Sequence, residues 1–435
     1  MRLKFKRVLA ILTLTILIFE SAFAKASACD GHSTYWFDYS AIFWGSVKSG
    51  GCDYINSSGC LVHIEQTINY VFYIIKENRT YDQVLSDMPQ GNGDTSLLLF
   101  GRKITPNHHS LVDNFVLLDN FYVDGEVSAD GHDWCMGAYA TDYMEKNWPT
   151  SYGGRGKGAI GKTSLNKQFI WDQANQFNVS FRTYGEFVNA DNTPRIPVLK
   201  DHYTTTYPTG DLRDSDTMRY RIWQNDFDSL LRENKLPRLM TFRMLSDHTE
   251  GTAAGRPTPF AHVADNDLAI GMMIEHISKS PIWENTVVFI AEDDAQNGAD
   301  HVDAHRSTAY VAGGYVKRKF VDHTAYSTSS MLRTMELILG LPPMTQFDAA
   351  ATPMWKCFSK TANLTPFTAV PALVDLTQKN SPKKTPLALK SMKFDFTKED
   401  RVPAMEFNEV IWKAVKGENS IMPAPVRSAF LKSEK

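Results

Sequence analysis

From Tyr70 onward, short apolar runs rich in β-branched and aromatic residues alternate with segments of helical periodicity. This alternation is typical of α/β proteins built around a buried, mostly parallel sheet. The expected strands are 70–75, 115–121, 179–184, 239–245 and 286–291. We therefore predict an α/β fold in which polar residues that follow the strands gather at one edge of the sheet.

Two helices have clear sequence signals. Asp265 is the expected N-cap of the first, whose apolar face carries residues at i, i+3, i+4 and i+7, namely Ile270, Met273, Ile274 and Ile277. The second is expected to have Ser329 or Ser330 as its N-cap. It should end at Gly340, which two prolines follow closely.

The N-terminus has the features of a secretory signal peptide over residues 1–24. Basic residues precede an apolar run from Val8 to Phe19, and Ala22-Phe23-Ala24 follows. The apolar run is shorter than the roughly 20 residues of a membrane span, and no later segment reaches that length. We predict an exported protein, periplasmic or extracellular, with no transmembrane segment in the mature chain. Lipoprotein anchoring at Cys29 is an alternative.

The remaining chain divides into three parts by composition. We expect an N-terminal extension at 25–68, a catalytic domain at 69–360, and a C-terminal wrap on the same domain at 361–435. A Cys52–Cys60 disulfide is plausible in an oxidising compartment. The net charge of −3 has no basic run behind it. Nucleic acid is therefore not an expected partner, and we expect a small-molecule or lipid-like substrate instead.

Acidic and amide side chains follow two of the expected strands. Glu77 and Asn78 come after the first strand, and Asp293 and Asp294 come after strand 286–291. Two consecutive aspartates cannot both be buried and ionised unless a cation compensates them. The pattern predicts a divalent metal ion at this edge. Oxygen ligands suit Ca, Mg or Mn, and added histidines shift the preference toward Zn or Fe.

Further acid and imidazole groups follow the same strands. Asp247 and His248 follow strand 239–245, and His301, Asp303 and His305 lie beyond Asp294. Each has a structural alternative: Asp247 suits a cap or turn, and His305 suits the surface. Taken together, they indicate a metal or catalytic site. Asp247, Asp303 and His305 are candidates for a second metal site or for substrate contact.

Ser128 is the candidate nucleophile. It lies in a polar, glycine-flanked turn after the expected strand 115–121. A serine beside a metal can accept a phosphoryl group, and a helix that begins here would also help to hold a phosphate. Helix capping is the structural alternative for this residue. His132 is a candidate donor to the leaving or non-bridging oxygen.

At these residues the sequence resembles the phosphoesterase family that contains bacterial phospholipases C and an acid phosphatase. The matching segments are Lys76 to Asp82, Thr105-Pro106-Asn107, Leu118 to Tyr122, Ser246-Asp247-His248, and Asp293-Asp294 through Asp300-His301-Val302. The resemblance covers roughly residues 70 to 345. The segment around Ser128 departs from the phospholipase pattern, which has a threonine.

The resemblance implies an alkaline-phosphatase-like three-layer sandwich, a central mostly parallel sheet flanked by helices. It also implies a metal held by Glu77, Asn78, Asp293 and Asp294, with His248 and His301 assisting Ser128. The expected reaction is hydrolysis of a phosphate monoester, a phosphodiester or a phospholipid head group through a phosphoserine. A binding protein for phosphorylated ligands on the same fold is the alternative, and structural calcium is another.

Overall fold

The computed structural model describes residues 67–151, 168–210, 212–397 and 400–427, all within one compact unit that spans Ser49–Lys435. The expected signal peptide, nearly all of the N-terminal extension, and the Cys52–Cys60 pairing lie outside these residues. Cys135 and Cys357 are buried free thiols.

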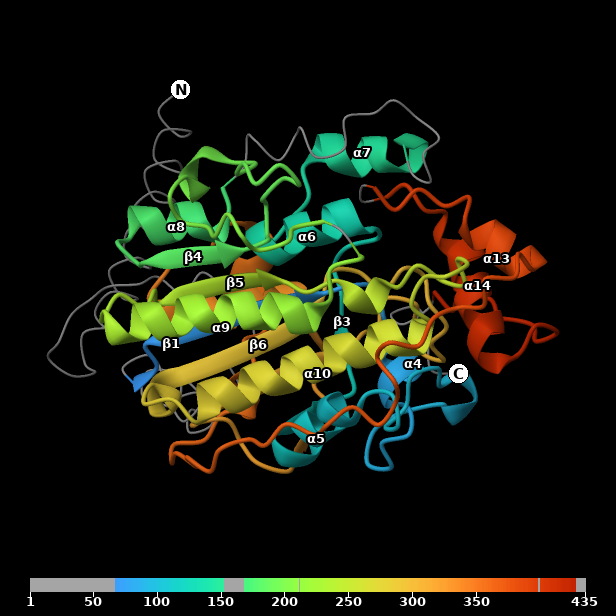
Figure 1. Ribbon diagram of the computed structural model, residues 1–435. Helices are drawn as coiled ribbons and strands as arrows, with labels where there is room; N and C mark the ends of the chain where they lie inside the picture. The colour runs from blue at the N-terminus through green and yellow to red at the C-terminus, as the bar shows by residue number, and fades with distance from the viewer. Residues whose placement is uncertain (1–66, 152–167, 211, 398–399, 428–435) are drawn as a thin grey trace, which may run out of the picture. The chain divides into compact units, whose positions relative to one another are not determined.

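A five-stranded sheet in the order β4-β5-β1-β6-β7 forms the centre of the fold (Figure 1). Its strands are β1 (Tyr70–Lys76), β4 (Phe181–Tyr184), β5 (Leu239–Arg243), β6 (Thr286–Glu292) and β7 (Ala309–Gly313). The first four strands of that order are parallel, and only β7 runs antiparallel, beside β6. The predicted mostly parallel sheet is confirmed.

Helices cover both faces of this sheet. Phe72 of β1 packs on Trp223 of α9 (Asp216–Arg232), with ring centroids 6.4 Å apart. The next residue, Tyr73, points to the opposite face. There it interacts with Cys135 of α6 (Ser128–Gly137). Figure 1 shows α9 and α10 (Pro259–Ser278) lying side by side across the first face. The three-layer arrangement explains why β1 and β6 are almost continuously apolar and buried.

The prediction of one strand at 115–121 is wrong. Two short strands replace it, β2 (Val116–Leu118) and β3 (Phe121–Tyr122), and they pair with β8 (Phe320–Asp322) and β9 (Tyr326–Ser327) outside the main sheet. Asp119 lies at the break. Its buried carboxylate accepts one hydrogen bond from the Asn92 backbone N–H and pairs with His323. These side-chain bonds hold the chain out of a continuous ladder.

Both predicted helices exist, but their first residues differ from the predictions. Helix α10 begins at Pro259 after the N-cap Thr258, while Asp265 lies inside the helix and accepts a 2.6 Å hydrogen bond from the Asp216 backbone. Helix α11 (Thr328–Leu339) follows the N-cap Ser327 rather than Ser329 or Ser330. Gly340 ends it as predicted, in the left-handed conformation at φ +73°.

Shorter elements complete the described chain. The helices are α4 (Tyr81–Leu85), α5 (Pro106–Asn114), α7 (Asp142–Ser151), α8 (Ile170–Gln176), α12 (Gln346–Ala350), α13 (Pro386–Ser391) and α14 (Ala404–Lys416). The C-terminal segment therefore carries two helices in addition to irregular chain. Across the residues described, no helix combines the length and apolar character that crossing a bilayer requires.

Candidate metal and phosphoester site

Two parallel strands deliver the central carboxylates. Lys76 at the end of β1 is in register with Glu292 at the end of β6, so the residues that follow each strand emerge side by side. The Asp293 backbone N–H donates to the Lys76 carbonyl over 3.0 Å, which extends the pairing by one step. Glu77, Asn78, Asp293 and Asp294 are all buried at this edge. The structure thus brings together the four residues predicted as metal ligands.

Ser128 joins this group as the first residue of α6. Its hydroxyl lies 2.9 Å from Asp294 Oδ2 and 3.3 Å from Asn78 Oδ1. The Ser128 side chain therefore points at the carboxylates instead of capping its own helix, which was the structural alternative. The N-terminus of α6 lies at the same place, and its dipole favours an anion such as phosphate, although the Ala129 N–H already donates to Asp400 Oδ1 over 3.2 Å.

A glycine lets α6 approach so closely. A Cβ atom on Gly131 would lie 2.5 Å from the Asp293 carbonyl oxygen, which is backbone and cannot move aside cheaply. Only a residue without a side chain fits there. Gly131 therefore helps to set the distance between Ser128 and the strand end.

His132 lies one helical turn after Ser128, on the same face of α6. Its Nε2 is 3.5 Å from both Glu77 Oε1 and Asp293 Oδ2, and its Nδ1 is 3.1 Å from Glu186 Oε1. Burial alone would lower the pKa of His132, but the Glu186 carboxylate raises it well above the ordinary value. The imidazole thus lies among three buried carboxylates.

The carboxylates differ strongly in their electrostatic surroundings. Burial, together with the adjacent Asp294, raises the pKa of Asp293 well above its ordinary value, and burial raises the pKa of Asp294 to about 7. Burial would also raise the pKa of Glu77, but the Arg243 guanidinium, 2.7 Å from Oε1, outweighs it, and the pKa is lowered to about 2. Asp293 and Asp294 are therefore the two carboxylates that most need a cation.

A chain of amides fixes which atom Asn78 presents to them. Asn408 Nδ2 donates to the backbone carbonyls of Gln296 and Asn297, so Asn408 Oδ1 faces Gln296 Nε2, 3.3 Å away. Gln296 Oε1 then accepts from Asn78 Nδ2 over 2.6 Å. This relay leaves Asn78 Oδ1 facing the carboxylates. Rotating the Asn78 amide would let its nitrogen donate to them, but would set its oxygen against the Gln296 oxygen.

The resulting cluster of oxygens fits a divalent metal ion. Asn78 Oδ1 lies 2.9 Å from Asp293 Oδ1 and 3.1 Å from Asp294 Oδ2, although none of these three atoms is a donor. Adjacent ligands of an octahedral ion with bonds of about 2.1 Å are separated by about 3.0 Å. A cation between the oxygens would turn their repulsion into coordination. Glu77, His132 and Asp293 form a metal-ligand grouping as well, since one donor atom from each lies within 4.8 Å of the others.

Asp247 lies directly beside Glu77. Its Oδ1 accepts from the Glu77 backbone N–H over 3.1 Å, and its Oδ2 is 2.9 Å from Lys76 Nζ. Lys76 also reaches Glu292 at 2.6 Å. Asp247 thus supports the backbone at Glu77 and is neutralised by a buried lysine.

His248 follows Asp247 at the same edge of the sheet. Its Nδ1 is 2.9 Å from the Thr249 carbonyl, and its ring stacks on Phe407 of α14 with centroids 5.2 Å apart. Burial lowers the pKa of His248, and the nearby Glu77 carboxylate opposes this effect.

His301 belongs to another cluster. Its Nδ1 lies 2.6 Å from Asp82 Oδ2, and Asp300 completes the group. The fully buried Arg306 guanidinium lies 3.0 Å from both of these carboxylates. This cluster therefore contains its own compensating cation, which contacts both carboxylates directly.

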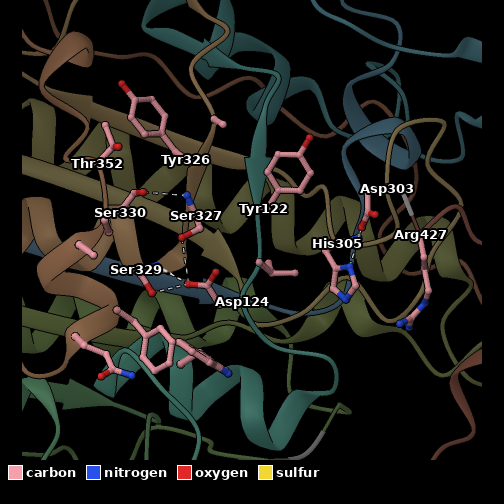
Figure 2. A pocket seen from close by; sticks show the side chains of 17 residues that line it. Tyr122, Asp124, Asp303, His305, Tyr326, Ser327, Ser329, Ser330, Thr352 and Arg427 are labelled. Atoms are coloured by element: carbon pink, nitrogen blue, oxygen red, sulfur yellow. Dashed lines mark hydrogen bonds and ion pairs between the residues drawn. The ribbon is translucent and has the colours of Figure 1, made fainter. Parts of the chain in front are cut away.

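Asp303 and His305 line a pocket of about 750 Å³ whose described walls also include Tyr122, Trp134, Tyr326, Phe347 and Arg427 (Figure 2). His305 Nδ1 is 2.7 Å from Asp303 Oδ1, and Nε2 is 3.1 Å from Glu126 Oε1. Figure 2 also shows Ser327 and Ser329 pointing at Asp124, whose Oδ2 accepts a 2.6 Å hydrogen bond from Ser329 Oγ. The Asp124 carboxylate thus occupies the N-terminus of α11, where an anionic ligand could otherwise bind.

Four residues around the centre were not predicted from the sequence: Glu186, Arg243, Gln296 and Asn408. Glu186 and Arg243 follow or end strands β4 and β5, so their strand-end positions were a usable signal. Gln296 lies two residues after Asp294. Asn408 lies more than a hundred residues further along, on α14, and no spacing rule connects it to the site.

Comparison with known protein families finds one that matches this chain. The model described as "Phosphoesterase family" matches residues 89–342, which is more than half of the chain. No curated protein matches significantly.

Solved structures match with low identity. One is a protein in the alkaline phosphatase superfamily from Vibrio parahaemolyticus, at 14% identity and TM-score 0.44, covering 68% of this chain and 78% of that one. Human ectonucleotide pyrophosphatase/phosphodiesterase 5 matches at 9% identity and TM-score 0.44, and the match covers 68% of this chain and 100% of that one. The phosphonate monoester hydrolase of Agrobacterium radiobacter matches at 10% identity and TM-score 0.39, and the match covers 63% of this chain and 74% of that one.

Proposed function

The chain belongs to the phosphoesterase family and is a phosphoester hydrolase, and we propose that it works through a phosphoserine at Ser128 beside a divalent metal ion. The metal ligands in this proposal are Glu77, Asn78, Asp293 and Asp294. The substrate is a small-molecule or phospholipid phosphate ester, and the enzyme acts after export.

The position of the Ser128 hydroxyl carries this proposal. It lies at a helix N-terminus, 2.9 Å from Asp294 Oδ2 and 3.3 Å from Asn78 Oδ1. A serine whose only role was to cap α6 would bond to the helix backbone instead. Here the Ser128 oxygen instead points into a group of oxygens that a cation would stabilise. A serine nucleophile that is activated by a metal needs this position.

The residues divide the reaction between them. Asp294 orients the Ser128 hydroxyl and draws off its proton through their hydrogen bond as the oxygen attacks phosphorus. The bond to the leaving oxygen breaks as the serine–phosphorus bond forms. Water later cleaves the serine–phosphorus bond, restoring the hydroxyl and releasing phosphate from a monoester substrate or a phosphomonoester from a diester substrate. A divalent ion bound by the surrounding oxygens supplies positive charge that favours the serine alkoxide and offsets the charge on the phosphoryl group.

His248 is the better placed of the two imidazoles proposed to protonate the leaving oxygen. It follows β5 at the edge where Glu77 emerges, and the Glu77 carboxylate acts on its pKa. His301 lies with Asp82, Asp300 and Arg306 and already engages Asp82 and Asn92 through its two ring nitrogens. We therefore assign His301 a supporting role in a neighbouring ion-pair cluster.

The test is hydrolysis of a chromogenic phosphate monoester and of the matching diester by purified protein, with and without chelator. We expect turnover that chelation abolishes and that Ser128→Ala lowers by at least a thousandfold, on the order of losses at catalytic nucleophiles. The preferred ester gives the substrate class. Acid quenching should trap one phosphoryl group per chain on the wild-type protein and none on the variant.

Ser229→Ala is a matched control, because this serine is on α9 and its hydroxyl donates to Glu233 in an exposed pair. It should leave turnover unchanged. Full activity of Ser128→Ala would overturn the serine mechanism. Failure to hydrolyse either ester, with metal bound, would favour the binding-protein alternative.

A further inference from the structure

His132 has an unmet bonding requirement at the centre of the site. The residue is 5% exposed, and its Nε2 is a buried atom with no hydrogen-bond partner among the described residues. Asp293 Oδ2, which it faces, is in the same condition. His132 Nδ1 and Glu186 Oε1 also lack a hydrogen bond of good geometry, but they lie 3.1 Å apart, within hydrogen-bond distance. Buried polar atoms in folded proteins are nearly always bonded, so two that face each other call for a missing partner.

The distances indicate what this partner is. Nε2 is 3.5 Å from Glu77 Oε1 and 3.5 Å from Asp293 Oδ2. This is too long for a normal N–H···O hydrogen bond. Two ligands of one ion with bonds of about 2.0–2.1 Å are separated by about 2.9 Å in octahedral geometry and by up to about 3.4 Å as the number of ligands falls to four. The imidazole is thus separated from each carboxylate by about the distance between two ligands of one ion, and one donor atom from each of the three residues lies within 4.8 Å of the others.

We propose that His132 Nε2 is a ligand of the metal centre, together with Glu77 and Asp293, and that Glu186 positions the imidazole. This inference rests on the proposed function, because it concerns the same metal centre. It replaces the role of hydrogen-bond donor to the substrate that the sequence suggested for His132.

Glu186 is placed as the positioning residue for such a ligand. Its Oε1 lies 3.1 Å from His132 Nδ1, on the side of the ring opposite Nε2. A carboxylate that accepts from one ring nitrogen leaves the other free to bind a metal, an arrangement common at zinc sites. Glu186 is 1% exposed and follows β4, and its backbone carbonyl accepts a 3.0 Å hydrogen bond from Thr183 Oγ1. The position of this carboxylate is therefore well defined.

Arg243 does not prevent coordination by Glu77. Its Nε and Nη2 both donate to Glu77 Oε1, at 3.1 and 2.7 Å. These two bonds use the lone pairs of Oε1, but Glu77 has a second oxygen, Oε2, so one carboxylate can serve the guanidinium and an ion.

An imidazole ligand predicts which ions the centre selects. Ca²⁺ and Mg²⁺ prefer oxygen ligands alone, while imidazole suits Zn²⁺ and other first-row transition ions. We expect the centre to bind Zn²⁺ and Co²⁺ more tightly than Mg²⁺ or Ca²⁺.

The experiment measures metal binding to the chelated, full-length protein, without any substrate. Titration with Zn²⁺ by calorimetry gives the affinity, and titration with Co²⁺ gives a visible absorption band that intensifies when the ion is four- or five-coordinate. His132→Ala should weaken Zn²⁺ binding by at least about 100-fold and remove most of the Co²⁺ band. Glu186→Gln should weaken Zn²⁺ binding by roughly 10- to 100-fold, as is usual for partners of ligating histidines.

His276→Ala is the matched control, because His276 pairs with Asp228 between α10 and α9. It should leave both titrations unchanged. Wild-type Zn²⁺ affinity in the folded His132→Ala variant would overturn the inference, and so would tighter binding of Mg²⁺ than of Zn²⁺ by the wild type.

A measurement on the wild-type protein guards against a variant that fails to fold. The ¹¹³Cd resonance of the cadmium-loaded protein should lie downfield of the range of all-oxygen sites, and a shift within that range would refute a nitrogen ligand. The result also separates the two proposals. If Ser128→Ala abolishes chelator-sensitive turnover but His132→Ala binds Zn²⁺ normally, only this inference fails.

Discussion

The carboxamide of Asn408, on α14, donates a 2.6 Å hydrogen bond to the backbone carbonyl of Gln296, two residues after Asp294. Because this bond fixes the Asn408 amide, its oxygen must face the Gln296 side chain, which in turn fixes the orientation of Asn78. A helix near the C-terminus thus determines that Asn78 presents an oxygen to the proposed metal.

Asn408→Leu should therefore weaken the binding of a divalent metal by about 10-fold or more, the usual effect of removing a partner of a metal ligand. Leucine keeps the volume but neither donates to the loop carbonyls nor accepts from Gln296. Calorimetric titration of the chelated protein measures the effect. Asn114→Leu, at an exposed asparagine whose side-chain amide donates to Ser110 within α5, is the control. Equal affinity in both variants would show that the relay does not act on the site.

Gly131→Ala should lower turnover strongly, because its Cβ would lie 2.5 Å from the Asp293 carbonyl oxygen and would push α6 away from the strand end. Overpacking of this kind destabilises a protein by about 1–3 kcal/mol. We expect a lower melting temperature and, in the folded protein, a fall in kcat larger than any change in KM. Gly210→Ala is the control, since a Cβ there meets nothing within 4 Å. Unchanged kcat in Gly131→Ala would mean that α6 can shift without moving Ser128.

Strand-end chemistry made much of the site predictable from sequence. Glu77 and Asp293 each follow an apolar run long enough to be recognised as a buried strand, and parallel neighbours bring such residues together. Strand boundaries were predicted to within two residues for β1, β4, β5 and β6. Ser128 was identifiable because the turn before α6 is polar and flanked by glycines.

The remaining errors arise from bonds that no local pattern encodes. Asp119 interrupts the expected strand 115–121 through contacts with Asn92 and His323, the latter about two hundred residues away. Asp265 looks like an N-cap but bonds to the Asp216 backbone from inside α10. The partners of Asn408 and Glu186 likewise depend on tertiary packing, so their contribution to the site became visible only in three dimensions.

Metal removal should destabilise the protein, and more so at alkaline pH. The pKa of Asp294 is raised to about 7 when no ion is present. A carboxyl group with a raised folded-state pKa destabilises the fold increasingly as pH rises from its unfolded value, 3.8, to the folded one. We expect the loss of melting temperature on chelation to be greater at pH 8 than at pH 5. Asp294→Asn should reduce this difference. An equal loss at both pH values would contradict the raised pKa.

The pair between Glu126 and His305 should give a second, separate pH dependence. The His305 imidazole lowers the pKa of Glu126 to about 2, and Glu126 raises the pKa of His305. The contribution of Glu126 to the free energy of unfolding is fully present above its unfolded pKa of 4.5 and is lost as pH falls toward 2. The His305 contribution is present below 6.5 and is lost as pH rises through the raised value. The pair is therefore strongest between about pH 4.5 and 6.5.

Glu126→Gln should lower the melting temperature more at pH 5.5 than at pH 9, by an amount equivalent to at most about 1 kcal/mol, because the pair is partly exposed. Part of the loss should persist at pH 9, where Arg427 is still charged and still lies 3.0 Å from Glu126 in the wild type. Glu233→Gln is the matched control. Its partner Lys235 keeps its charge across this range, so its effect should not change with pH. A loss in Glu126→Gln that is the same at both pH values would assign the whole effect to Arg427 and none to His305.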